Sequence, residues 1–232
     1  MKGKVIAVTG ASGALGGVVA ELAAKRAASV AAIDFAAKPP DGLVGRLGPA
    51  ALILGGVDLT SAESARAAVA QIVAKFGRLD ALLNIAGGFL WDAIEGANPA
   101  NWDRMFAINL KTALNASQAA IPHLVASGAG RIVNVGAISA LKAAAGFGPY
   151  AASKGAVHRL TESLAEELKL KGVTVNAVLP SIIDTPANRA EMPKAAFDNW
   201  VSPADLAAIM LFLASDEARA VTGALIPVTG KV

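Results

Sequence analysis

The sequence predicts an α/β fold in which helices cover both faces of a parallel sheet, and three observations support this. Short, continuously apolar runs alternate with longer amphipathic stretches along the whole chain. A glycine-rich turn follows the first apolar run. The 232 residues are 54% hydrophobic and 17% charged, so a large core can form. Together these features predict one Rossmann-like, doubly wound domain over residues 1–232, since a domain usually has roughly 100–200 residues.

Seven apolar runs are expected to be the strands. Most are too short and too uniformly apolar to be surface strands, which favours a sheet buried on both faces. The runs are residues 5–9, 30–34, 51–54, 79–86, 131–135, 173–178 and 225–228.

Helices are expected between these runs. One is predicted over 61–76, with Thr60 and Glu63 at capping-box spacing. Another begins at Ser202, with Pro203 at its first position. A long helix is predicted from about 150 to 170. Residues 36–50, rich in Pro and Gly, are expected to form a loop instead of a full crossover helix.

Composition excludes several classes of function. The chain has no cysteine, and its two histidines are far apart without metal-ligand spacing, so no metal site is expected. The net charge is +3, but Lys and Arg never occur three in a row, which argues against a nucleic-acid partner. No stretch is apolar enough to span a membrane. We therefore expect a cytoplasmic protein that acts on a small molecule.

The first chemical motif runs from Thr9 to Gly16, directly after the first predicted strand. Glycines allow the backbone to approach a pyrophosphate, and the N-terminus of the following helix attracts its charge. Asp34 ends the second strand 18 residues later, where a carboxylate can accept both ribose hydroxyls of NAD and repel the 2′-phosphate of NADP. The alternatives are that the glycine-rich segment is an ordinary tight turn and that Asp34 is an ordinary residue at the end of a strand.

Tyr150 and Lys154 form the second motif. They are four residues apart and thus lie on one face of the predicted long helix. A tyrosine can donate a proton to a substrate when a nearby cation lowers its pKa. Taken alone, however, a Tyr and a Lys at this spacing usually lie on the surface without a functional role.

Taken together, these motifs resemble the short-chain dehydrogenases/reductases over essentially the whole chain. The resemblance implies that Tyr150 is the general acid/base, that Lys154 binds the nicotinamide ribose and lowers the Tyr150 pKa, and that Asn109 holds a water in the proton path. The cofactor-binding positions that it implies, besides Tyr150 and Lys154, are Gly10, Ser12, Gly13, Ala14, Leu15, Gly16, Asp34, Asp58, Leu59, Asn84, Ala86, Gly87, Pro180, Ile183 and Thr185. The expected cofactor is NAD(H), with NADP(H) as the alternative.

The sequence departs from the family pattern at three places. Ala14 and Ser181 replace two glycines. Ala137 occupies the position of the usual catalytic serine, 13 residues before Tyr150. Ser139 is the nearest hydroxyl, and it could substitute only if the chain bends, since in an extended strand residues 137 and 139 stand about 6.6 Å apart.

One branch of the family, the dihydropteridine reductases, resembles this chain in these departures and also has Ala at the serine position. An electron-poor quinonoid ring develops less localised charge than a ketone and needs fewer hydrogen-bond donors. The first expectation is therefore hydride transfer to a quinonoid dihydropteridine-like or other activated acceptor. The alternatives are an ordinary ketone/secondary-alcohol oxidoreductase and a non-catalytic dinucleotide-sensing protein.

Other features are open to two interpretations. Phe89, Trp91, Trp102 and Trp200 either line a substrate pocket or fill core and interface positions, and His158 is either catalytic or packed within its helix. Residues 187–201 fall where the family places its substrate lid, but could form an ordinary loop. The helices near 103–126 and 150–170 usually mediate oligomerisation in the family, so a homodimer or homotetramer is expected.

Overall fold

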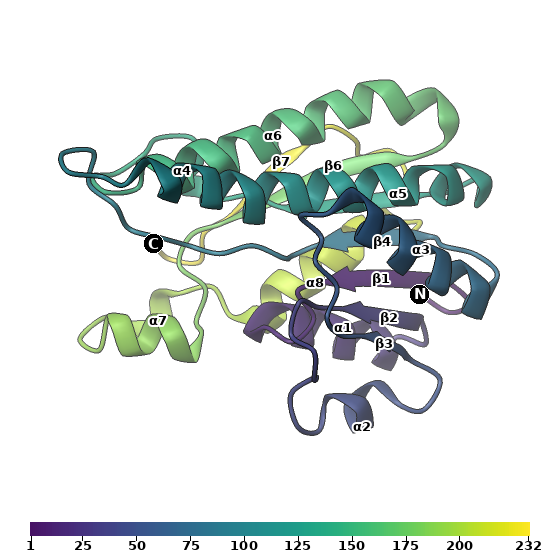
Figure 1. Ribbon diagram of the computed structural model, residues 1–232. Coiled ribbons are helices and arrows are strands. Elements are labelled where there is room, and N and C mark those ends of the chain that lie inside the picture. The colour runs from purple at the N-terminus through teal and green to yellow at the C-terminus, as the bar shows by residue number, and fades with distance from the viewer.

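The computed structural model describes residues 1–232, and its strands form one seven-stranded parallel sheet in the order β3-β2-β1-β4-β5-β6-β7 (Figure 1). The order reverses between β1 and β4, which creates the crevice at the carboxyl ends of the strands where such sheets bind ligands. The strands are β1 (Val5–Thr9), β2 (Ser29–Ile33), β3 (Leu52–Leu54), β4 (Ala81–Asn84), β5 (Arg131–Val135), β6 (Thr174–Pro180) and β7 (Leu225–Val228).

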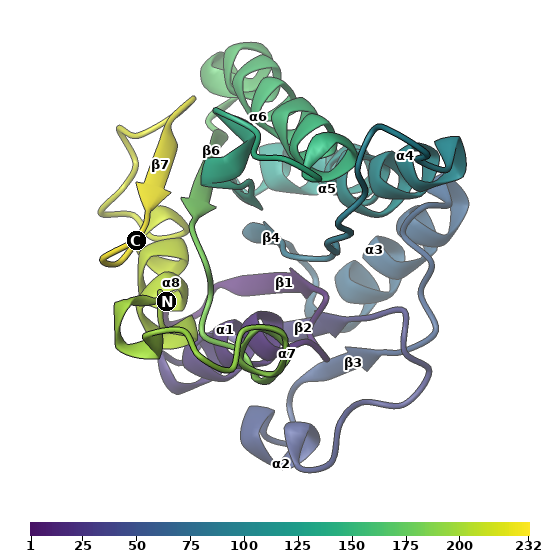
Figure 2. The same cartoon turned by 90° about the vertical axis from the view of Figure 1, so that its left-hand side faces the viewer.

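Helices cover both faces of the sheet (Figure 2). Helices α1, α2 and α8 pack on one face, and α3, α5 and α6 pack on the other. The helices are α1 (Ala14–Lys25), α2 (Leu43–Leu47), α3 (Ala62–Phe76), α4 (Pro99–Met105), α5 (Thr112–Ala126), α6 (Gly148–Leu168), α7 (Pro186–Glu191) and α8 (Pro203–Leu213). Four further turns are η1 (Phe106–Lys111), η2 (Ile138–Ala140), η3 (Lys169–Lys171) and η4 (Phe197–Asn199).

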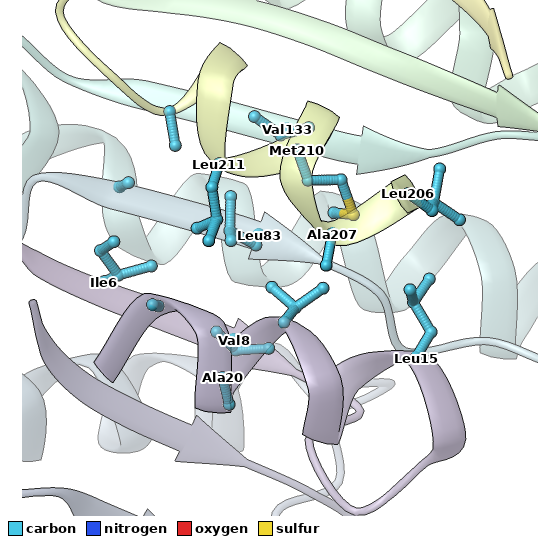
Figure 3. Packing of buried hydrophobic residues seen from close by; sticks show 14 of the residues in the cluster. Ile6, Val8, Leu15, Ala20, Leu83, Val133, Leu206, Ala207, Met210 and Leu211 are labelled. Carbon is cyan, nitrogen blue, oxygen red and sulfur yellow. The ribbon is translucent and has the colours of Figure 1, made fainter. Parts of the chain in front are cut away.

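Alternate residues of each central strand enter opposite halves of the core. Ile6 and Val8 of β1 pack with α1 and α8, as Figure 3 shows, whereas Val5 and Ala7 pack on the other side of the sheet. Because both faces are buried, polar alternation is absent from these strands. This arrangement confirms the α/β prediction and explains the uniformly apolar runs.

Strands β2, β3, β4 and β6 differ from the predicted bounds, and the end of β4 differs because a polar side chain competes for the backbone. The run 79–86 was expected to be strand throughout, but β4 ends at Asn84. The N–H groups of Ile85 and Ala86 donate to the Thr9 hydroxyl at 2.9 and 3.0 Å instead of extending the sheet. The chain therefore leaves the sheet beside the glycine-rich turn.

The segment 36–50 has no full crossover helix, as predicted, but it contains one short helix, and one predicted cap is corrected by the structure. Leu43–Leu47 form a short helix, α2, flanked by Gly42 and Gly48 at positive φ. The buried side chains of Leu43 and Leu47 hold this helix on the core. Helix α3 is capped by Ser61, which accepts from Ser64 N, and not by Thr60, whose hydroxyl donates to Asp58. The Ser202 cap of α8 is confirmed.

No helix has both the length and the apolar character needed to cross a membrane.

Candidate active site

The glycine-rich turn between β1 and α1 is closely packed. A Cβ at Gly16 would lie 2.1 Å from the Gly10 carbonyl oxygen, and Gly10 itself has a φ of +65°. A side chain is therefore excluded at these two positions, and the turn lies close against the start of α1, where backbone N–H groups attract an anion. This cradle fits the pyrophosphate of a dinucleotide.

Asp34 lies directly after β2, and the backbone fixes both of its carboxylate oxygens. Oδ2 accepts from Ser12 N at 2.8 Å and Oδ1 accepts from Ala36 N at 2.9 Å. Each oxygen keeps a second lone pair for another donor. The carboxylate is thus held at the end of the glycine turn, where the sequence predicted a contact with the cofactor ribose.

A cavity of about 730 Å³ extends from Asp34 past the glycine turn to the carboxyl ends of β4 and β5. This volume is in the usual range for cofactor sites. Its lining contains twelve of the predicted cofactor-binding residues: Gly10, Gly13, Ala14, Leu15, Gly16, Asp34, Asp58, Leu59, Ala86, Gly87, Ile183 and Thr185. Sequence reasoning missed seven others, which are Phe35, Val57, Thr60, Ile85, Ile108, Thr112 and Val135.

Five predicted cofactor residues are not among those that line this cavity: Ser12, Asn84, Tyr150, Lys154 and Pro180. The buried Asn84 side chain donates to Ser117 Oγ at 3.1 Å and to Asn134 Oδ1 at 2.8 Å, so it ties β4 to α5 and β5. Pro180 is the last, buried residue of β6. Both therefore support the site from within the protein core, and Ser12 contributes through its backbone N–H to Asp34.

Tyr150 and Lys154 lie one turn apart on α6, as predicted. Burial raises the pKa of Tyr150 to about 12 and lowers the pKa of Lys154 to about 8. Lys154 Nζ donates to the Val135 carbonyl oxygen at 2.8 Å. The expectation that the lysine charge lowers the pKa of Tyr150 is thus not met in the protein alone, because burial of the phenol dominates. The Tyr150 phenol is therefore protonated at physiological pH.

Asn109 lies in the π-helical turn η1, between α4 and α5, and braces two parts of the site. Its Oδ1 accepts from Gly88 N at 2.9 Å, and its Nδ2 donates to Gly88 O at 3.1 Å and Ser153 Oγ at 3.0 Å. The Ser153 hydroxyl donates in turn to the Tyr150 carbonyl oxygen at 2.8 Å. Both side-chain N–H groups of Asn109 are engaged, so any water would meet an oxygen of this residue. Ser153 was not singled out from the sequence, because its spacing alone reads as an ordinary helical serine.

The chain bends directly after Ala137, the residue at the usual serine position. Ala137 is extended, but Ile138–Ala140 form the turn η2, so the condition for Ser139 to approach the site is met. His158 Nε2 accepts a hydrogen bond from Ala137 N at 3.3 Å. A Cβ at Gly136 would lie 2.5 Å from that nitrogen, so the glycine makes room for the imidazole. Burial lowers the pKa of His158 to about 4, which agrees with a packed, neutral histidine.

The aromatic residues divide into two groups. Phe89 contacts the Tyr150 ring edge-on, with centroids 5.0 Å apart, and the Phe147 ring at 5.1 Å. Trp200 is buried and packs against Phe197 at 4.9 Å. Phe89 is therefore placed beside the candidate acid/base, whereas Trp200 anchors the segment after β6.

The predicted lid segment, residues 187–201, is closed at its base. Asp184 N donates to Val201 O at 2.8 Å, and Val201 N donates to Ile182 O at 2.9 Å. Arg189 of α7 forms two hydrogen bonds with the Asp184 carboxylate, at 2.6 and 2.7 Å. The segment is thus an ordered excursion at the same end of the molecule as α4 (Figure 1).

Comparisons with known proteins show which family the chain belongs to. A family profile described as short chain dehydrogenase matches residues 4–196. The chain is 32% identical to the 3-oxoacyl-[acyl-carrier-protein] reductase FabG of Thermotoga maritima, over 99% of this chain and 98% of the relative. It is 34% identical to the 2,5-dichloro-2,5-cyclohexadiene-1,4-diol dehydrogenase LinX of Sphingobium indicum, over 99% of this chain and 96% of the relative.

A solved structure, that of an NAD⁺-bound xylitol dehydrogenase, superimposes with a TM-score of 0.92. The two chains are 23% identical in sequence, and the match covers 99% of this chain and 98% of the xylitol dehydrogenase chain. The match therefore confirms the fold. The protein thus belongs to the short-chain dehydrogenase/reductase family and is an NAD(P)-dependent oxidoreductase. These relatives are named as a 3-oxoacyl-[acyl-carrier-protein] reductase and a diol dehydrogenase, so the expected closeness to dihydropteridine reductase is not supported.

Proposed function

We propose that this protein is an NAD(H)-dependent oxidoreductase that interconverts a ketone and a secondary alcohol. The observation that carries the proposal is the placement of Tyr150 and Lys154 on one turn of α6, next to a dinucleotide-sized cavity with Asp34 at its far end. The names of the relatives, a 3-oxoacyl reductase and a diol dehydrogenase, support the same chemistry.

The residues divide the work as follows. The cofactor, when bound, supplies hydride to the substrate or takes it. The Tyr150 hydroxyl gives a proton to the carbonyl oxygen during reduction and removes it during oxidation. The half of α6 that carries Tyr150 is held by the Asn109–Ser153 hydrogen bond. The buried Lys154 ammonium is within reach of the Gly87 edge of the cavity and can bind the ribose there.

The preference for NAD(H) is supported by the fixed carboxylate of Asp34. A 2′-phosphate would bring up to two negative charges toward this carboxylate, and each pair of unit charges 4 Å apart costs about 1–4 kcal/mol near a protein surface. The two backbone N–H donors prevent Asp34 from turning away. NADP(H) binding is therefore expected to be weaker.

A second candidate substrate class is an electron-poor ring such as a quinonoid dihydropteridine. It is favoured by one observation: Ala137, buried in the structure, supplies no hydroxyl where other family members carry serine. An activated acceptor tolerates this loss better than a ketone does, since removal of one donor to a developing oxyanion costs roughly 10²–10³ in rate.

A screen of NADH and NADPH oxidation separates these functions. The purified protein is assayed with a panel of ketones and with quinonoid dihydropterin, and NAD⁺ reduction is assayed with the matching alcohols. The proposal predicts steady NADH oxidation with ketones. Preference for quinonoid dihydropterin would favour the second candidate, and the absence of turnover with any acceptor or alcohol would indicate a dinucleotide-sensing protein.

We further propose a homodimer or homotetramer, in which the helices near 103–126 and 150–170 contact another copy. Only Asp103, Arg104 and Lys111 are fully charged in the first of these stretches. A helix so poor in charge favours burial against a partner. Light scattering coupled to size-exclusion chromatography gives the mass in solution, and a monomer would contradict the proposal.

A further inference from the structure

Two loops beside Tyr150 expose large apolar side chains. The first, residues 85–98, follows β4, and the second, residues 141–147, follows η2. Three side chains of the first loop stand well out of the core: Phe89 is 46% exposed, Trp91 59% and Ile94 69%. Single exposed apolar residues are common, but several grouped at the ligand-binding end of a sheet point to a binding surface.

Packing joins these side chains into one surface. The Phe89 and Phe147 rings contact each other edge-on, and both face the Tyr150 ring at 5.0 and 6.3 Å between centroids. Trp91 covers Gly146, the residue before Phe147, so closely that a Cβ there would lie 2.1 Å from its indole ring. We call Phe89, Trp91, Ile94 and Phe147 the apolar wall.

Backbone contacts hold the apolar wall in place. Asp92 N donates to the Gly146 carbonyl oxygen at 2.8 Å, and this bond ties the two loops together. Gly146 adopts a φ of +75°, which a residue with a side chain rarely does. Ile94 lies against Gly148, where a Cβ would meet its Cδ1 at 3.2 Å. The apolar wall is thus preorganised, which lowers the entropic cost of binding.

Charge is sparse on this surface. Lys142 is the only cationic residue in the two loops, and it is exposed. The Asp92 carboxylate accepts from Asn101 Nδ2 at 2.9 Å. Arg189, in the segment after β6, is occupied by Asp184 in a two-bond ion pair. These loops therefore offer no cluster of cations to bind a carboxylate, a phosphate or a phosphopantetheine-type arm.

We propose that the substrate is an uncharged ketone whose carbonyl group belongs to or adjoins an apolar ring, together with the corresponding secondary alcohol. This inference rests on the proposed function and specifies its substrate class. The ring lies against the apolar wall, and the carbonyl oxygen reaches the Tyr150 hydroxyl. In reduction the carbonyl carbon gains a hydride as NADH becomes NAD⁺, and the oxygen gains a proton from Tyr150, which solvent later replaces.

The test compares kcat/KM for NADH-dependent reduction of four ketones. These are 1-tetralone and cyclohexanone as uncharged rings, acetoacetate as a small anion, and acetoacetyl-coenzyme A as a large one. We expect kcat/KM for 1-tetralone to be at least tenfold higher than kcat/KM for either anion. A preference for either anion would overturn the ring-ketone inference and leave the proposed function intact, whereas no turnover with any ketone would overturn the proposed function itself.

A variant series then locates the recognition. We expect Trp91→Ala to lower kcat/KM for 1-tetralone at least tenfold relative to that for 2-butanone, mainly through KM, and Trp91→Phe to restore most of it. The matched control is Val44→Ala, which removes a side chain that is 53% exposed in α2 and should change neither value.

Binding is measured separately, by titration calorimetry of 1-tetralone into each variant with its cofactor, and folding is checked from Tm. Equal losses for both ketones through kcat, or unchanged binding of 1-tetralone by a folded Trp91→Ala protein, would overturn the role of the apolar wall.

Discussion

Asp34→Asn tests how the protein selects its cofactor. Both carboxylate oxygens accept backbone N–H groups, at 2.8 and 2.9 Å. An asparagine has one acceptor oxygen, so one of the two N–H groups loses its partner, and the net loss is about 1 kcal/mol. The substitution also removes the negative charge that opposes a 2′-phosphate. The repulsion that is lost is at least about 1.4 kcal/mol, which corresponds to a factor of about ten in Kd.

The wild-type protein should therefore bind NADH at least tenfold more tightly than NADPH. In Asp34→Asn, NADH binding should weaken severalfold while NADPH binding improves, so that the ratio of the two Kd values falls at least tenfold. Fluorescence titration with both cofactors gives these ratios directly. Equal wild-type affinities, or a ratio that the substitution leaves unchanged, would refute the assignment of Asp34 to the cofactor ribose.

Two further predictions concern the region around Ala137. Because burial lowers the pKa of His158 from 6.5 to about 4, the unfolded chain binds the extra proton first as the pH falls through this window. Stability should thus decrease from pH 6.5 to 4 by up to about 3 kcal/mol more in the wild type than in His158→Gln, measured by urea unfolding; parallel pH profiles would contradict this. Ala137→Ser should raise kcat/KM for ketones, by less than the roughly 10²–10³ of a preorganised donor, and Ser139→Ala should change little. Loss of ketone reduction in Ser139→Ala, with no gain in Ala137→Ser, would show that Ser139 already supplies the hydroxyl.

Much of the fold could be predicted because its signals are local. Strands β1, β5 and β7 have the predicted bounds, since each coincides with one short, predominantly apolar run. The errors in the predicted elements come from contacts between residues that are far apart in the sequence. Strand β4 ends early because the Thr9 hydroxyl, 76 residues away from Ile85, takes its backbone N–H. Helix α2 forms because the core holds Leu43 and Leu47 in an otherwise loop-like segment.

The candidate site was predictable where a motif fixes the geometry. The glycine turn, Asp34 and the Tyr150–Lys154 pair lie where their spacing placed them. The role of Asn84 was not predictable, since its burial with Asn134 depends on two strands meeting in the sheet. The same holds for Ser153, whose partner Asn109 is 44 residues away. The family motif also could not reveal that the pKa of Tyr150 is set by burial of the phenol and not by the charge of Lys154.

The proposed function requires the Tyr150 hydroxyl to move the proton. Tyr150→Phe keeps the ring that packs against Phe89 and removes only the hydroxyl. The decisive measurement is kcat for ketone reduction by this variant at saturating NADH, together with its Kd for NADH. We expect kcat to fall by roughly 10²–10⁴-fold while the Kd is nearly unchanged. A Tyr150→Phe protein with wild-type kcat would show that the Tyr150 hydroxyl does not move the proton.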